Sequence, residues 1–179
     1  IAVAQILNYN ATPSQPIING RTHSWADISQ FRHDNPSAYS DSTLIAKLAQ
    51  YIADIGEEMN ADYGLDGTST NRFQAASLLR QLGYDNVNVK SYDENEIYEM
   101  LDNGKPVFIR AVDSISGEGH AWVIDGRRQL QIITNKVTYR DGEMISREYY
   151  ASYLHRYLHC NYGWSGLCDG YYVYNIFDV

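Results

Sequence analysis

The spacing of apolar residues divides the chain into a first part with a helical period and a second part with the period of strands. In the first part, apolar positions recur three or four residues apart, as they do on one face of a helix. This pattern predicts helices over residues 1–10, 41–60, 71–82 and 93–103. In the third helix, Phe73 is expected to face the core with Leu78 and Leu79. The stretches 17–40 and 61–70 lack this period and are rich in small polar residues, which favours loops and turns.

After residue 105 the apolar residues follow the pattern of strands. We expect strands over residues 106–112, 120–125, 130–139, 144–150, 157–162 and 171–176. Gly126 is expected to end the second strand, and Asp141-Gly142 fits the turn of a hairpin. Helices followed by an antiparallel run are typical of an α+β fold. The pattern therefore predicts one domain over residues 1–179, with a helical subregion 1–103 and a strand-rich subregion 106–179.

Length, composition and charge narrow the function classes. A chain of 179 residues suits one domain, and 44 % hydrophobic with 20 % charged residues excludes a disordered protein. No apolar run approaches the roughly 20 residues that a membrane-spanning helix needs, so no membrane span is expected. Fourteen Lys and Arg against 22 Asp and Glu give a net charge of −8. Because an acidic chain repels phosphates, a nucleic acid is not expected as a partner.

His120 is the first candidate for chemistry. It follows Gly117-Glu118-Gly119 and begins an apolar strand, so its imidazole is expected beside a cleft rather than deep in the core. The small residues before it would let a substrate backbone approach closely. The alternative is a histidine that caps a strand and contacts water, which is the commoner case for a lone histidine.

Asn161 is the second candidate. An Asn carbonyl can accept a hydrogen bond from an imidazole N–H and hold the ring's tautomer and angle. A neighbouring aromatic residue would shield that bond from water, and Tyr162 and Trp164 follow directly. The alternative is a turn asparagine before a Gly-rich loop, with Trp164 in the core.

The two cysteines, Cys160 and Cys168, are too few for a disulfide scaffold or a four-thiolate metal site, and their spacing leaves a bridge or two free thiols open. His155 and His159 are four residues apart, which aligns two metal ligands only on a helix, whereas this stretch ends as a strand. No metal site is therefore expected. Cys160 directly precedes Asn161 on a strand, so their side chains point to opposite faces and Cys160 is not expected to be a nucleophile.

Taken together, residues 119–126 (GHAWVIDG) and 161–166 (NYGWSG), with DGYY at 169–172, resemble the streptopain family of bacterial papain-like cysteine peptidases. That family shows a GHAxVxDG stretch with the catalytic histidine and a later NWGWxG stretch with the orienting asparagine. The opening AVAQILNY at residues 2–9 and SWADI at 24–28 also fit, in the same order. The resemblance covers nearly the whole chain.

The resemblance implies a papain-like fold and peptide hydrolysis through a thioester acyl-enzyme. His120 would be the general acid and base, and Asn161 would orient it. Tyr162 and Trp164 would shelter this pair, although Tyr162 replaces the family's usual Trp. Backbone groups around Gly119 would bind the substrate chain, with Trp25 on the leaving-group side of the cleft. No metal or organic cofactor is implied.

The resemblance also implies a nucleophile outside these residues. Alignment on Ala4-Gln5 puts the catalytic cysteine three residues before Ile1, so we expect a chain truncated at its N-terminus. The hairpin around Asp141-Gly142 looks like an addition to the family pattern. The expected partners are polypeptide substrates and a propeptide or protein inhibitor, and the expected location is secreted or cell-surface.

Two other functions stay open. The missing cysteine favours a catalytically inactive papain-like binding or interaction module. Against this, His120 and Asn161 both keep their flanking glycines and aromatic residues, which a binding module does not need. Another papain-like thiol enzyme, an amidase or acyl transferase, is the third reading, but such enzymes usually pair the histidine with a second His or an Asp, so Asn161 favours a peptidase.

Overall fold

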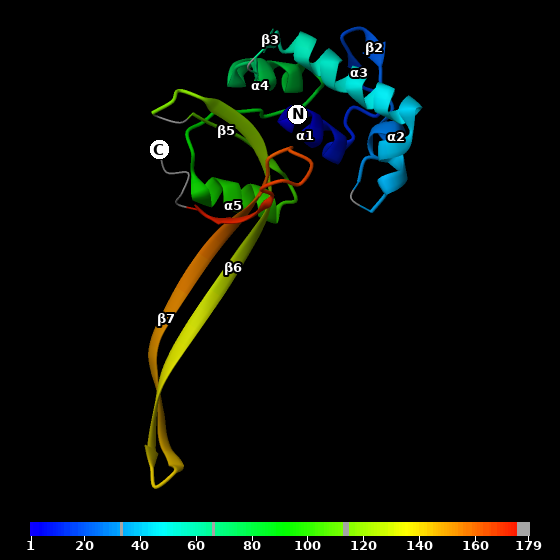
Figure 1. Ribbon diagram of the computed structural model, residues 1–179. Helices are drawn as coiled ribbons and strands as arrows, with labels where there is room; N and C mark the ends of the chain where they lie inside the picture. Colours follow the sequence, from blue (N-terminus) through cyan, green and yellow to red (C-terminus); the bar gives the residue numbers. More distant parts are fainter. Residues whose placement is uncertain (33, 66, 113–114, 175–179) are drawn as a thin grey trace. The chain divides into compact units, whose positions relative to one another are not determined.

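The computed structural model describes residues 1–32, 34–65, 67–112 and 115–174. The chain folds into two compact units, and each is described by itself (Figure 1). Unit 1 comprises Ile1–Ser91 and Phe108–Val123, and unit 2 comprises Tyr92–Val107 and Ile124–Val179. None of the helices in the described part of the chain is long and apolar enough to span a membrane.

Helices dominate unit 1, and the three longest lie where the apolar period predicts helices. They are α1 (Ala2–Asn10), α2 (Trp25–Ile28), the 3-10 helix η1 (Pro36–Ser40), α3 (Ser42–Glu58) and α4 (Arg72–Gln81). Side chains that accept hydrogen bonds from the first free backbone N–H groups fix where the longer helices begin. Asp41 caps α3 in this way, and Asn71 forms a reciprocal capping box with Gln74 at the start of α4.

Two small hairpins and two short helices occupy the stretches that the sequence left as loops. Strand β1 (Ile17–Ile18) pairs with β2 (Arg21–Thr22), and β3 (Asp62–Gly64) pairs with β4 (Gly67–Ser69). The interpretation of 17–40 as plain loop was therefore wrong, because strands of two residues are too short to show a period. Ser24 caps α2 by accepting a hydrogen bond from the backbone N–H of Asp27.

The core of unit 1 forms around α1, which buries Ala2, Val3, Ala4, Ile6 and Leu7. Tyr51 of α3 is fully buried against it and donates a hydrogen bond from its hydroxyl to the carbonyl of Ala4, 3.1 Å away. The expectation for Phe73 was wrong, since its ring is 62 % exposed. Helix α4 buries Ala75, Ala76, Leu78 and Leu79, a face that leaves Phe73 on the opposite side.

Unit 2 combines one helix with a long antiparallel hairpin. Helix α5 (Glu94–Asp102) is capped by Asp93. The sheet order is β5-β6-β7-β8, with β5 Val107–Val112, β6 Gly119–Arg140, β7 Glu143–Asn161 and β8 Gly170–Val173. All of β5 except Val107 belongs to unit 1, and β6 begins in unit 1 and continues into unit 2. The chain thus combines helices with antiparallel strands, as an α+β fold does.

The predicted hairpin turn at Asp141-Gly142 is confirmed, but the two strands that it joins are longer than expected. Gly126 does not end a strand, because β6 runs through it without interruption. A Cβ atom at this position would lie 3.2 Å from the Cβ of His159. The glycine therefore allows β7 to approach β6 closely and is not a turn residue. Residues 175 and 176 of the last predicted strand lie outside the described residues.

Candidate active site

His120 lies near the start of β6 in unit 1, where it is half-buried. Its ring is stacked on that of Trp122, with centroids 6.1 Å apart and planes 11° from parallel. Residues two apart in a strand share a face, so the strand itself brings this pair together. Trp122 is buried, and its indole therefore holds one side of the imidazole in an apolar setting.

Gly119, expected at the substrate cleft, is in close contact with β5. A Cβ atom at this position would lie 3.3 Å from Nη2 of Arg110 and 3.5 Å from the carbonyl oxygen of Ala111. Packing against β5 thus gives a structural reason for a glycine directly before His120.

Trp25, the other expected cleft residue, begins α2 in unit 1. Its indole N–H donates a hydrogen bond to the carbonyl of Pro13 at 2.7 Å. The ring meets Tyr51 edge-on, with centroids 5.9 Å apart, and packs against the core of unit 1. The orientation of Trp25 is therefore fixed by the fold.

Asn161 ends β7 in unit 2 and is half-buried. Its Oδ1 accepts a hydrogen bond from the backbone N–H of Gly163 at 3.0 Å, which closes a local turn. Next to it, the backbone N–H of Tyr162 donates to Oδ1 of Asp169 at 2.8 Å. These two bonds fasten both ends of the loop after β7, and Asp169 therefore fixes the position from which Asn161 projects.

Tyr162 and Trp164 form an aromatic cluster in the same loop. Their rings are stacked with centroids 5.5 Å apart, and Tyr172 meets Tyr162 edge-on at 5.8 Å. Burial raises the pKa of Tyr162 to about 12, and the nearby Cys160 and Tyr172 add to this shift. Tyr162 is consequently a neutral phenol at neutral pH. The aromatic residues expected beside Asn161 are thus packed against one another.

Unit 2 holds a histidine–aspartate pair that the sequence did not predict. Nδ1 of His159 lies 2.5 Å from Oδ1 of Asp125, and the ring of Tyr171 meets the imidazole edge-on at 5.0 Å. No local signal predicts this pair, because the two residues are 34 positions apart and lie on different strands. Among the described residues no three His, Cys, Asp or Glu side chains gather as a metal site.

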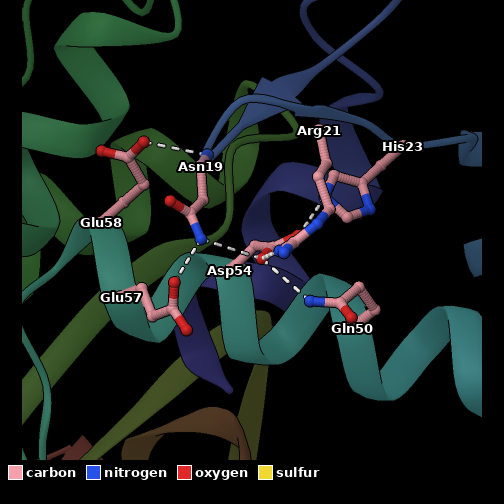
Figure 2. Close-up of polar contacts among 7 residues, drawn as sticks. All are labelled: Asn19, Arg21, His23, Gln50, Asp54, Glu57 and Glu58. Atoms are coloured by element: carbon pink, nitrogen blue, oxygen red, sulfur yellow. Dashed lines mark hydrogen bonds and ion pairs between the residues drawn. The ribbon is translucent and has the colours of Figure 1, made fainter.

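A second polar cluster missed from the sequence surrounds Asp54 of α3, which is fully buried (Figure 2). Oδ1 of Asp54 accepts hydrogen bonds from Gln50 at 3.0 Å and Asn19 at 3.2 Å and pairs with Arg21. Oδ2 lies 3.0 Å from Nε2 of His23. Every partner except Gln50 belongs to the β1–β2 hairpin or the residue after it, so the cluster fastens that hairpin to α3.

The charge of Asp54 is stabilised by these neighbours. Burial by itself would raise the pKa of this carboxyl. The hydrogen bonds from Asn19 and Gln50, together with the charges of Arg21 and His23, outweigh burial and hold the pKa below its usual range. The cluster therefore has a structural role within unit 1.

Both cysteines are free thiols, which decides the alternative that the sequence left open. Cys160 is fully buried in β7, and Cys168 is exposed in the loop before β8. The buried thiol has no access to a peptide substrate.

Comparison with known proteins identifies the family of this chain. No curated protein matches it. The model of the peptidase C10 family matches residues 1–172, which include both the segment around His120 and the segment around Asn161. The resemblance to streptopain is thereby confirmed, and the chain belongs to the peptidase C10 family, the streptopain family of cysteine peptidases.

Proposed function

We propose that this chain is the catalytic domain of a papain-like cysteine endopeptidase that cleaves polypeptides through a thioester acyl-enzyme. The observation that carries the proposal is the family match over residues 1–172, because it spans both candidate catalytic segments in one alignment. Family membership implies a cysteine peptidase. The roles of individual residues, the papain-like arrangement and a secreted or cell-surface location are part of the proposal.

His120 is the general acid and base of this mechanism. A cysteine thiolate attacks the peptide carbonyl carbon, and the C–N bond breaks as protonated His120 gives its proton to the leaving amine. Neutral His120 then removes a proton from water, which attacks the thioester and releases the thiolate. The stacking of His120 on buried Trp122 supports this role, since it fixes the ring plane and excludes water from one side.

Asn161 orients His120 by accepting its ring N–H. The bond from Gly163 to Asn161 Oδ1 supports this assignment, because it restricts the side chain and a carbonyl oxygen accepts two hydrogen bonds. The stacked Tyr162 and Trp164 shelter the orienting bond from water. A carbonyl that only orients the imidazole contributes less to the rate than the imidazole itself, which carries the proton.

The nucleophile is a cysteine expected N-terminal to Ile1, in the segment that leads into α1. Peptide dipoles of a helix stabilise a thiolate at its N-terminal end, as does a protonated histidine. Cys160 is unsuited to the role because it is fully buried, and the family pattern puts the nucleophile before the first helix and not at the position of Cys168. Gly119 and Trp25 line the substrate side of this site, and a propeptide or protein inhibitor would occupy the same cleft.

Hydrolysis of an unstructured protein such as denatured casein tests these roles in the natural polypeptide that contains this chain. His120→Ala is expected to abolish hydrolysis, whereas His155→Ala, the matched loss of an exposed histidine on β7, leaves the rate unchanged. Full hydrolysis by the His120→Ala protein would refute the assignment, and equal loss in both variants would show that the effect is not specific to His120.

A further inference from the structure

The hairpin formed by β6 and β7 continues far beyond the rest of the sheet in unit 2. Among the described residues, β8 pairs with Tyr157–Cys160 of β7, and Figure 1 shows β6 and β7 running on as a two-stranded ribbon away from α5. We name residues 129–154 of this ribbon the arm. Most large apolar side chains of the arm are exposed. A two-stranded ribbon in water is marginally stable by itself, so an apolar arm of this length indicates a partner.

One side-chain contact fixes which residues share a face of the arm. Gln131 Nε2 donates to Oγ of Ser152 at 3.0 Å, so these two residues lie opposite each other on one face. At the tip, Asp141 and Gly142 both have positive φ, 50° and 85°, as a two-residue hairpin turn requires. The turn puts Arg140 opposite Glu143, in the same register as the Gln131–Ser152 pair. Successive side chains therefore point to opposite faces of the ribbon along the whole arm.

The two faces of the arm differ in charge. The face of Gln131, which we call the aromatic face, carries Glu148 as its only charged residue and presents six large apolar side chains. These are Ile133, Val137, Tyr139, Met144, Tyr150 and Leu154. The opposite face, the mixed face, brings Lys136 opposite Arg147 and carries Arg140 with Glu143. Like charges in contact oppose association, so the aromatic face is the side suited to burial.

The exposed apolar area of the aromatic face is large enough for an interface at the lower end of the standard size. From their exposed fractions, the six apolar side chains present roughly 750 Å² to solvent, which is the most that they could bury, against the ~800 Å² that each partner buries in a standard interface. Their aromatic and Met content also matches the composition of interface cores.

We propose that the aromatic face docks on the same face of a second copy of this chain, with the two arms packed across a two-fold axis. In a two-fold dimer the same surface of both copies is in contact, so like charges must not lie opposite each other. The aromatic face, with one charged residue, satisfies this condition better than the mixed face. On this face Tyr150 lies opposite Ile133, and Glu148 lies opposite Asn135 in the next row. A two-fold axis between these two rows brings the Tyr150 hydroxyl of one copy to the Glu148 carboxylate of the other, a donor against an acceptor. The inference does not depend on the proposed function.

Sedimentation of the chain over a concentration series tests this arrangement. The wild type is expected to sediment with twice its mass of 20.4 kDa at micromolar concentration. The double variant Ile133→Ser/Tyr150→Ser is expected to raise the dimer Kd about 100-fold or more, as for loss of an interface hot spot. Ile132→Ser/Tyr149→Ser is the matched control, because it removes the same side-chain types from neighbouring positions on the mixed face, and it is expected to change Kd by less than about 3-fold.

Each other outcome overturns the proposal. A wild-type chain that stays monomeric to about 100 μM would exclude a second copy as the occupant. Equal weakening by the two double variants would show that the stability of the arm, and not contact through the aromatic face, sets Kd. As a second readout, Tyr150→Phe and Glu148→Gln should each weaken the dimer, and the combined variant should weaken it no further than either does alone. Additive effects would contradict the Tyr150–Glu148 contact.

Discussion

Nδ1 of His159 lies 2.5 Å from Oδ1 of Asp125, which ties β7 to β6 two residues before Asn161. Both side chains are about one-third exposed, at 30 % and 36 %, so the pair is screened by solvent. Its position favours a structural role: it holds the end of β7 from which the proposed orienting residue projects.

Asp125→Asn tests this role. It keeps the shape of the side chain and removes its charge. We expect the free energy of unfolding to fall by about 0.5–1.5 kcal/mol, the range for an ordinary hydrogen bond, because solvent screens the charge of this partly exposed pair. Urea denaturation measures this change, and kcat should stay within about threefold of the wild type. A loss of kcat as large as that in His120→Ala would instead make the pair part of the catalytic machinery.

A side chain at position 126 should destabilise the fold, because Gly126 lies against His159. In Gly126→Ala the new Cβ would lie 3.2 Å from that of His159, so His159 must move by a few tenths of an ångström. We expect a loss of about 1 kcal/mol in the free energy of unfolding, the lower end of the range for overpacking. Gly170→Ala is the matched control, since nothing lies within 4 Å of its added Cβ, and it should change stability by less than about 0.5 kcal/mol. Equal effects would show that strand propensity and not crowding governs both positions.

The buried carboxylate of Asp54 should make the stability of the fold depend on pH. Its pKa in the folded chain lies below its ordinary value of 3.8, so its charge stabilises the fold above that value and this contribution disappears as pH falls through the folded pKa. The wild type should therefore lose stability between about pH 5 and pH 2 more steeply than Asp54→Asn, which at pH 7 should be about 1–3 kcal/mol less stable. Thermal unfolding across this range measures both. Asp62→Asn, at an exposed aspartate, is the control, and an identical slope in Asp54→Asn and wild type would contradict the account.

Tyr162 separates the shielding role of an aromatic ring from any role of its hydroxyl. Because its phenol stays neutral, with a pKa of about 12, Tyr162→Phe should keep kcat/KM within about threefold. Tyr162→Ala exposes the neighbourhood of Asn161 to water and should lower kcat/KM by about 10-fold or more, since a hydrogen bond weakens when water competes. Peptide hydrolysis measures both. Equal losses in the two variants would mean that the hydroxyl carries the function.

Particular residues show how much of this structure the sequence could predict. The long helices were predictable because caps such as Asp41 and Asn71 and the apolar period act within a few residues. Phe73 was misplaced because a single aromatic residue does not define a helix face. Gly126 was taken for a strand end because its reason, the approach of His159, comes from a residue 33 positions away.

Part of the candidate site was likewise predictable from the sequence, and part was not. The motifs around His120 and Asn161 predict the family, since they are local in the sequence, and the family match confirms it. The Asp125–His159 pair and the Asp54 cluster were not predictable, because each joins side chains from different elements whose pairing depends on the fold. The arm was predictable as a hairpin from its turn, but the exposure of its apolar residues on both faces was not.

The most direct test of the central claim is the intact mass of the natural polypeptide before and after treatment with a thiol-directed epoxide. The account predicts one adduct per molecule, located by peptide mapping on a cysteine N-terminal to Ile1, and predicts that His120→Ala suppresses it because the thiolate loses its partner. An adduct only on Cys168, or full labelling of the upstream cysteine in His120→Ala, would contradict the assignment of His120 as the catalytic acid and base.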